Sequence, residues 1–145
     1  MNDRAQVTGL SHVAIATADA DALATTLCEA LGAVRDSEEL LDSGALRVVF
    51  VKLGPVTFEL LEPKDASHTV AKFLEKRGPG LHHVSLEVDD IVAALARAKD
   101  SGAQLIDAAP RRGAHATLVA FLHPKSFGGV LVELCQDASG RRPEP

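Results

Sequence analysis

Two histidines and two glutamates stand at matching places in two similar halves of the 145-residue sequence. Residues 9–15 recur as residues 80–86, an offset of 71 positions, and residues 56–60 recur as residues 130–134, an offset of 74. The halves therefore share one plan and differ by a few loop residues. Each half carries one histidine near its start and one glutamate near its end, which are His12 and Glu59 in the first half and His83 and Glu133 in the second.

These four side chains have the chemistry of a metal site. A single histidine or glutamate on a strand is more often a solvated residue on the open face of an antiparallel sheet. Here two of each occur together, and the repeats would bring them to one point if they paired side by side. Two imidazole nitrogens and two carboxylate oxygens suit a divalent first-row metal ion with positions left open for a substrate. We therefore predict that His12, Glu59, His83 and Glu133 bind one divalent metal ion.

The hydrophobic pattern predicts the same order of elements, βαβββ, in each half. In the first half it indicates a strand at 10–16, a helix from Asp19 or Asp21 to about residue 31, and strands at 33–39, 46–53 and 56–61. In the second half it indicates a strand at 82–88, a helix from Asp89 or Asp90 to about residue 100, and strands near 103–107, 117–122 and 129–135. Between the halves, residues 65–67 are expected to cap a short helix.

Alternation along the strands assigns each candidate ligand to a face of the sheet. His12 shares its face with Ala14 and Ala16, and His83 shares its face with Ser85. The candidates thus lie in rows of mostly small or polar side chains, opposite the rows that must pack against the helices. We expect an α+β fold in which residues 1–145 form a single domain. Its two pseudo-symmetric modules, 9–63 and 80–136, would be joined by a short helical linker and form a half-open barrel around a cleft.

Composition excludes several classes of protein. The formal net charge is −5 with scattered lysines and arginines, which argues against a nucleic-acid partner. No apolar run approaches the ~20 residues of a membrane span, and no secretory signal is visible at the start, so we expect a cytoplasmic protein that does not bind membranes. Cys28 and Cys135 are expected to be free, mostly buried thiols.

Other polar residues make weaker candidates. Cys135 shares the face of Glu133, but no basic partner for it is apparent, so it is expected to be a small core thiol and not a nucleophile. His82 is expected to be packed on the apolar side of its strand. His68 and His115 are expected at the surface, and His123 either caps a hairpin or touches a ligand.

The motifs of this sequence resemble those of a known superfamily. Paired βαβββ modules with the order His, Glu, His, Glu are similar to the vicinal-oxygen-chelate superfamily, which includes glyoxalase I, extradiol dioxygenases and bleomycin-binding proteins. Within it, residues 10–16 (LSHVAIA), 58–63 (FELLEP), 80–84 (GLHHV) and 121–134 (FLHPKSFGGVLVEL) resemble the methylmalonyl-CoA epimerases. The resemblance covers about residues 9–136, and its last motif is the most specific part. Glyoxalase I would show Asp-Pro-x-Gly where this chain has residues 123–126 (HPKS).

The resemblance implies a site and a reaction. The superfamily's metal ligands fall on His12, Glu59, His83 and Glu133, and it implies cobalt or manganese, with zinc, nickel or magnesium as alternatives. The implied reaction interconverts (R)- and (S)-methylmalonyl-CoA by removal of the C2 proton through a metal-stabilised enolate. Glu133 is the first candidate for the base and Glu59 the second.

The resemblance also implies partners and leaves alternatives. An acyl-CoA substrate and a homodimer are implied, with Arg111, Arg112 and Lys125 as candidates for the anionic CoA tail. Some epimerases have a catalytic glutamate in the third strand of the first half, at a position that this sequence fills with Arg47. The alternatives are a glyoxalase-like lyase or isomerase on another substrate, and a metal-free small-molecule binding module. The complete set of four ligands argues against the binding module.

Overall fold

The computed structural model describes residues 5–138, which form two compact units. One unit comprises residues 12–82, and the other comprises residues 5–11 together with residues 83–138. Within the described residues, no helix is long and apolar enough to cross a membrane.

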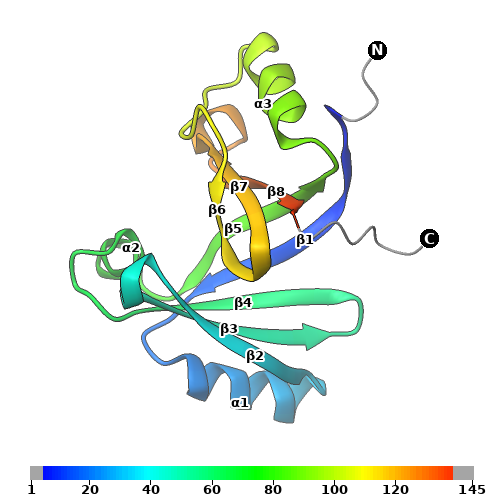
Figure 1. The fold of residues 1–145 in the computed structure, drawn as a ribbon. Coiled ribbons are helices and arrows are strands. Elements are labelled where there is room, and N and C mark those ends of the chain that lie inside the picture. The colour runs from blue at the N-terminus through cyan, green and yellow to red at the C-terminus, as the bar shows by residue number, and fades with distance from the viewer. Residues whose placement is uncertain (1–4, 139–145) are drawn as a thin grey trace. The chain divides into compact units, whose positions relative to one another are not determined.

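The first unit is a four-stranded sheet with two helices, in the strand order β2-β3-β4-β1 (Figure 1). Strand β1 runs parallel to β4, and β3 runs antiparallel to both β2 and β4. Of the two predicted caps, Asp19 and Asp21, Asp19 caps the first helix, because its carboxylate accepts a hydrogen bond of 3.0 Å from the backbone N–H of Ala22. The elements are β1 (Val7–Ala16), α1 (Ala20–Leu31), β2 (Val34–Leu41), β3 (Leu46–Leu53), β4 (Val56–Pro63) and α2 (Thr69–Arg77).

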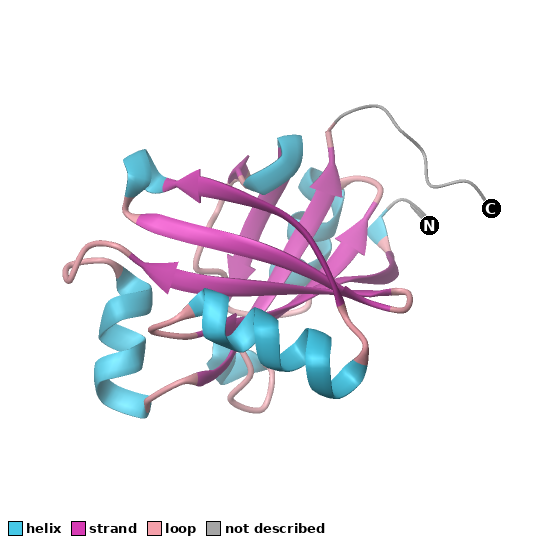
Figure 2. Ribbon diagram, turned by 90° about the horizontal axis from the view of Figure 1, so that it is seen from below, coloured by secondary structure: helices cyan, strands magenta, loops and turns pink. Residues whose placement is uncertain are grey.

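Helix α1 covers the apolar face of this sheet, and the core of the unit lies between the helix and the strands. In Figure 2, which views the molecule from the side of α1, the helix lies in front of the strands. Ala24 and Leu27 of α1 pack against Val49 of β3 and Leu60 of β4, and all four side chains are buried. The opposite face carries the small side chains of Ala14 and Ala16 on β1, as the alternation predicted, together with the apolar Val48 and Phe50 of β3.

The second unit repeats this plan with the strand order β5-β8-β7-β6. Strand β5 runs parallel to β8, and β7 runs antiparallel to β8 and β6. Asp90 caps the helix by accepting a 3.0 Å hydrogen bond from the backbone N–H of Ala93, and it stands 71 positions after Asp19. The elements are β5 (Gly80–Val88), α3 (Ile91–Asp100), β6 (Arg111–Arg112), β7 (Thr117–Leu122) and β8 (Val132–Asp137).

In the second half one predicted strand is absent, and another begins later than predicted. Residues 103–107 form no strand. Leu105 makes an isolated bridge to Leu122, and the two-residue β6 pairs with β7 instead. This segment is joined to β7 by separate hydrogen bonds and not by a strand ladder. In one of them the carboxylate of Asp107 accepts from the N–H of Phe121 at 2.8 Å. The last strand begins at Val132 and not at 129, because consecutive glycines with φ of 65° and 89° turn the chain just before it.

Helix α2 begins differently from the prediction. Its cap is His68, whose Nδ1 accepts a hydrogen bond of 3.1 Å from the N–H of Val70. Asp65 makes a local turn instead, accepting from the N–H of Ser67 at 2.8 Å. The expected surface position of His68 is wrong, because its side chain is 12% exposed and its Nε2 lies 2.7 Å from the carboxylate of Asp42.

Candidate metal centre

The first unit places one predicted ligand pair together. His12 of β1 and Glu59 of β4 lie on neighbouring parallel strands, and His12 Nε2 is 2.9 Å from Glu59 Oε2. Their side chains are 8% and 13% exposed. Glu59 is paired with Ala14, two positions after His12, so the imidazole reaches diagonally to the carboxylate.

The second unit places the other pair together in the same register. Glu133 of β8 is paired with Ser85, two positions after His83 on β5. His83 Nε2 lies 3.7 Å from Glu133 Oε2, and both side chains are buried. The hydroxyl of Ser85 donates a hydrogen bond of 2.8 Å to Glu133 Oε1. Glu133 is thereby held by a neutral donor on one oxygen, and its other oxygen faces the imidazole.

A phenylalanine lies beside each glutamate. Phe50 of β3 is paired with Glu59, and Phe121 of β7 is paired with Glu133. The ring of Phe121 meets that of His83 edge to face, with centroids 5.1 Å apart. Sequence analysis missed these two aromatic residues and the role of Ser85. Phe50 and Phe121 stand 71 positions apart, so the repeat itself carried the signal that would have found them.

Each pair has a geometry that fits coordination to one ion. Two donor atoms that each lie ~2.1 Å from a metal are about 3.0 Å apart at right angles and about 3.4 Å apart at the tetrahedral angle. The separations of 2.9 Å and 3.7 Å lie close to this range, so each pair needs only a small side-chain adjustment to hold an ion. The ring nitrogens and carboxylate oxygen offered by His12, Glu59 and His83 are donors that a divalent metal takes.

Comparison with known proteins identifies the family. Residues 11–121 match the family described as Glyoxalase/Bleomycin resistance protein/Dioxygenase superfamily. The chain belongs to this superfamily. This membership confirms the resemblance that the sequence motifs predicted.

Within the superfamily, the chain is similar to epimerases of CoA thioesters. It is 42% identical over 129 residues to the ethylmalonyl-CoA/methylmalonyl-CoA epimerase of Cereibacter sphaeroides, covering 88% of this chain and 96% of that one. It is 41% identical over 139 residues to the mitochondrial methylmalonyl-CoA epimerase of Homo sapiens, covering 90% and 79% of the two chains. A solved structure of a methylmalonyl-CoA epimerase in complex with methylmalonyl-CoA and NH4+ has a TM-score of 0.88 and 30% identity to this protein, covering 95% and 100%. The predicted fold class is thereby confirmed.

Arg47 does not occupy the face that carries Glu59. On β3, the residue paired with Glu59 is Phe50, and Val48 shares its face, whereas Arg47 is paired with Glu62 and points to the side of α1. Arg47 therefore does not point toward the candidate ligand Glu59. On β3, the face that carries Glu59 has the apolar side chains of Val48 and Phe50.

Arg47 instead joins α1 to the sheet. Its guanidinium makes two hydrogen bonds of 3.0 Å to the carboxylate of Asp21 on α1, and it also bonds Glu38 of β2. Hydrogen bonds from Arg47 and then from Arg35 lower the pKa of Asp21 from 3.8 to about 2. The same contacts with Asp21 and Glu38 raise the pKa of Arg47.

Glu62 ties the start of α1 to β4, three residues after Glu59. Burial acts to raise its pKa, but the ammonium of Lys64 and the backbone N–H of Ala20 outweigh burial, and the net pKa lies below its usual value. Glu62 Oε2 accepts from Ala20 N–H at 2.7 Å, and Lys64 Nζ lies 2.6 Å from Glu62 Oε1. Sequence analysis did not single out this carboxylate, although it lies in the FELLEP motif.

The remaining candidates are sorted by their contacts. Arg111 is exposed, and its guanidinium lies over the ring of Phe121 at 5.4 Å, so it reaches the face that carries Glu133.

Cys135 is buried, as expected for a core thiol. His123 caps the turn after β7, accepting from the N–H of Lys125 at 3.0 Å. His82 packs edge-on against Phe73 at 4.9 Å, and His115 is exposed.

Proposed function

We propose that the protein is a metal-dependent epimerase that interconverts (R)- and (S)-methylmalonyl-CoA. The observation that carries the proposal is the recurrence of one His–Glu pair, in the same strand register, in both units. The similarity to methylmalonyl-CoA epimerases over most of the chain supports it.

The proposed centre combines both pairs. His12, Glu59, His83 and Glu133 would hold one divalent ion, with cobalt or manganese as the expected metal and zinc, nickel or magnesium as alternatives. When bound, the ion would hold the thioester and carboxylate oxygens and stabilise the negative charge that develops when the C2 proton leaves. This assignment rests on donor chemistry and on the shared register of the pairs.

The two glutamates are the proposed groups for proton transfer. Epimerisation requires removal of the C2 proton on one side of the substrate and its return on the other. Glu133 is the proposed base on one side, because the hydroxyl of Ser85 fixes one carboxylate oxygen and orients the other. Glu59, held by His12, is the proposed partner on the opposite side. A carboxylate that is not coordinated to the ion would be the stronger base.

Positive side chains of the second unit would bind the anionic CoA portion. Arg111 is the strongest candidate, since Phe121 supports its guanidinium and Asp107 lies 3.6 Å from its Nε. Arg112 and Lys125 are exposed and would act as supporting charges. The proposal also includes a homodimer, for which light scattering should give about twice the chain mass of 15.2 kDa, and a mass near that of one chain would contradict it.

Solvent exchange at C2 tests the proposal directly. The protein is stripped of metal with a chelator, reloaded with Co²⁺ or Mn²⁺, and incubated with one stereoisomer of methylmalonyl-CoA in D₂O. Deuterium should appear at C2 only in the metal-loaded sample, together with the other stereoisomer. Absence of exchange with every divalent metal, in protein that binds both metal and thioester, would exclude the epimerase. Turnover of a glutathione hemithioacetal in its place would establish the glyoxalase-like alternative.

A further inference from the structure

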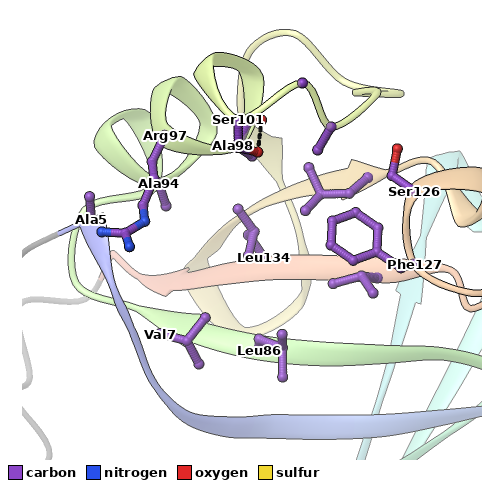
Figure 3. A pocket seen from close by; sticks show the side chains of 14 residues that line it. Ala5, Val7, Leu86, Ala94, Arg97, Ala98, Ser101, Ser126, Phe127 and Leu134 are labelled. Atoms are coloured by element: carbon purple, nitrogen blue, oxygen red, sulfur yellow. Dashed lines mark hydrogen bonds between the residues drawn. The ribbon is translucent and has the colours of Figure 1, made fainter.

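A pocket lies behind the sheet in the unit formed by residues 5–11 and 83–138. Its volume is about 570 Å³, within the ~300–1,000 Å³ range of small-molecule sites. Leu86 of β5 and Leu134 of β8 line one side, and α3 covers it (Figure 3). Leu134 follows Glu133 on the same strand, so their side chains point to opposite faces of the sheet. The pocket is therefore separate from the face that carries the second ligand pair.

The pocket lies beneath a part of α3 that carries alanines where α1 carries leucines. The two helices follow N-cap aspartates that stand 71 positions apart, so Ala94 and Ala98 of α3 are equivalent to Leu23 and Leu27 of α1. In the first unit both leucines pack into the core cluster beneath the helix, whereas Ala94 and Ala98 line the pocket. Ile91 and Leu95 of α3 stand where α1 has Ala20 and Ala24, so the two helices place their large side chains at different positions. The pocket lies beside the two alanines of α3.

The lining carries a single charge, at one end. Arg97 of α3 is the only charged residue among the fourteen that line the pocket, and it lies beside Ala5. Among residues 5–138, no carboxylate forms an ion pair with Arg97. Phe127 stands at the opposite end of the pocket (Figure 3). The pocket is thus mostly apolar and has one positive charge, at the end where Arg97 lies.

We propose that this pocket binds an aliphatic monocarboxylate with a chain of about eight carbons. The carboxylate pairs with the guanidinium of Arg97, and the chain extends along the leucines toward Phe127, where its burial drives binding. Charge complementarity selects an acid over the corresponding alcohol. The site is independent of the proposed epimerase reaction, so binding to it is measured apart from activity.

Calorimetric titration with octanoate tests this site. The wild-type protein should bind one octanoate per chain with a Kd of ~0.1–1 mM, as expected for about ten heavy atoms. Ala98→Leu restores the leucine of the first repeat and should weaken binding at least 10-fold by filling the pocket. Ala96→Leu makes the same change on the exposed side of the same helix and should leave binding unaltered.

A second variant tests the role of the charge. Arg97→Gln should weaken octanoate binding by about 3-fold, the effect of one partly exposed ion pair, and should leave 1-octanol binding unchanged. Circular dichroism verifies that each variant is folded. If Ala98→Leu unfolds, Arg97→Gln still tests whether octanoate binds in this pocket. The proposal is overturned by absence of saturable octanoate binding to the wild type, or by equal affinity in folded Ala98→Leu. Failure of octanoate to bind, combined with loss of dimers in Ala98→Leu, would show that a second copy of the chain covers the pocket.

Discussion

Ser85 donates a hydrogen bond of 2.8 Å to Glu133, and the equivalent position in the first unit is filled by Ala14, which has no hydroxyl. Glu59, paired with that alanine, lies 2.9 Å from His12 Nε2, whereas Glu133 lies 3.7 Å from His83 Nε2. The two carboxylates are therefore held by different groups on otherwise matching strands. This difference makes the two halves of the proposed centre chemically distinct.

Ser85→Ala should impair the half of the reaction that uses Glu133. A hydrogen bond to a charged group contributes ~1.5–3 kcal/mol, so its loss should lower the rate of C2 exchange for one stereoisomer by about 10-fold or more. Metal content should not change, because serine is not a proposed ligand. Exchange rates of both stereoisomers in D₂O measure the effect, and Ser67→Ala on the exposed loop before α2 is the control. Equal rates in Ser85→Ala and wild type would remove Ser85 from the mechanism.

His12→Ala should release the metal. Loss of groups that merely orient a ligand costs ~10–100-fold in affinity, and removal of the ligand itself should cost more. Metal analysis after dialysis against a chelator measures the loss. His115→Ala, at an exposed position, should retain metal as the wild type does. Retention of a full metal complement by His12→Ala would show that His12 is not a ligand.

Arg47→Leu should lower stability in a pH-dependent way without changing C2 exchange per bound metal. Arg47 faces α1, and its contacts depress the pKa of Asp21 to about 2. A depressed folded-state pKa contributes stability above the unfolded value of 3.8, and this contribution is lost as pH falls through about 2. The difference in melting temperature between wild type and Arg47→Leu should therefore be largest near pH 6 and decrease below pH 4.

A second exposed arginine provides the control for Arg47→Leu. Arg112→Leu, at an exposed position, should show a small difference in melting temperature. A loss of exchange activity in fully metallated Arg47→Leu would place Arg47 in the reaction after all. A pH-independent difference in melting temperature would show that packing and not charge accounts for its effect.

Strand alternation predicted the faces of the candidate ligands because it is not affected by small errors in strand ends. His12 and His83 keep their faces whether β1 and β5 begin at the predicted or the observed residues. The same alternation places Arg47 on the face opposite Glu59, since a shift of one residue on a strand moves a side chain to the opposite face. The observed register sets Phe50, and not Arg47, beside Glu59, and this register depends on strand pairing that the sequence pattern does not give.

Two elements depend on side-chain contacts between residues far apart in the sequence, and the sequence pattern did not predict them. The cap of α2 is His68 and not Asp65, since His68 also bonds to Asp42, 26 positions away. Residues 103–107 have the apolar pattern of a strand, but their hydrogen bonds go singly to β7, and the ladder is replaced by a carboxylate contact from Asp107. Contacts of this kind depend on tertiary structure, which periodicity does not encode.

Glu133→Gln should separate binding from chemistry. The amide oxygen can still coordinate a metal ion and accept the hydrogen bond from Ser85, so the acyl-CoA should bind with moderately reduced affinity. The amide cannot accept the C2 proton, and loss of general-base catalysis costs ~10²–10⁴-fold. Exchange at C2 should therefore fall far more for one stereoisomer than for the other. Glu59→Gln should show the opposite preference, since Glu59 is the equivalent carboxylate in the first unit. Small and equal losses for both stereoisomers in Glu133→Gln would show that Glu133 is only a ligand and that another group takes the proton.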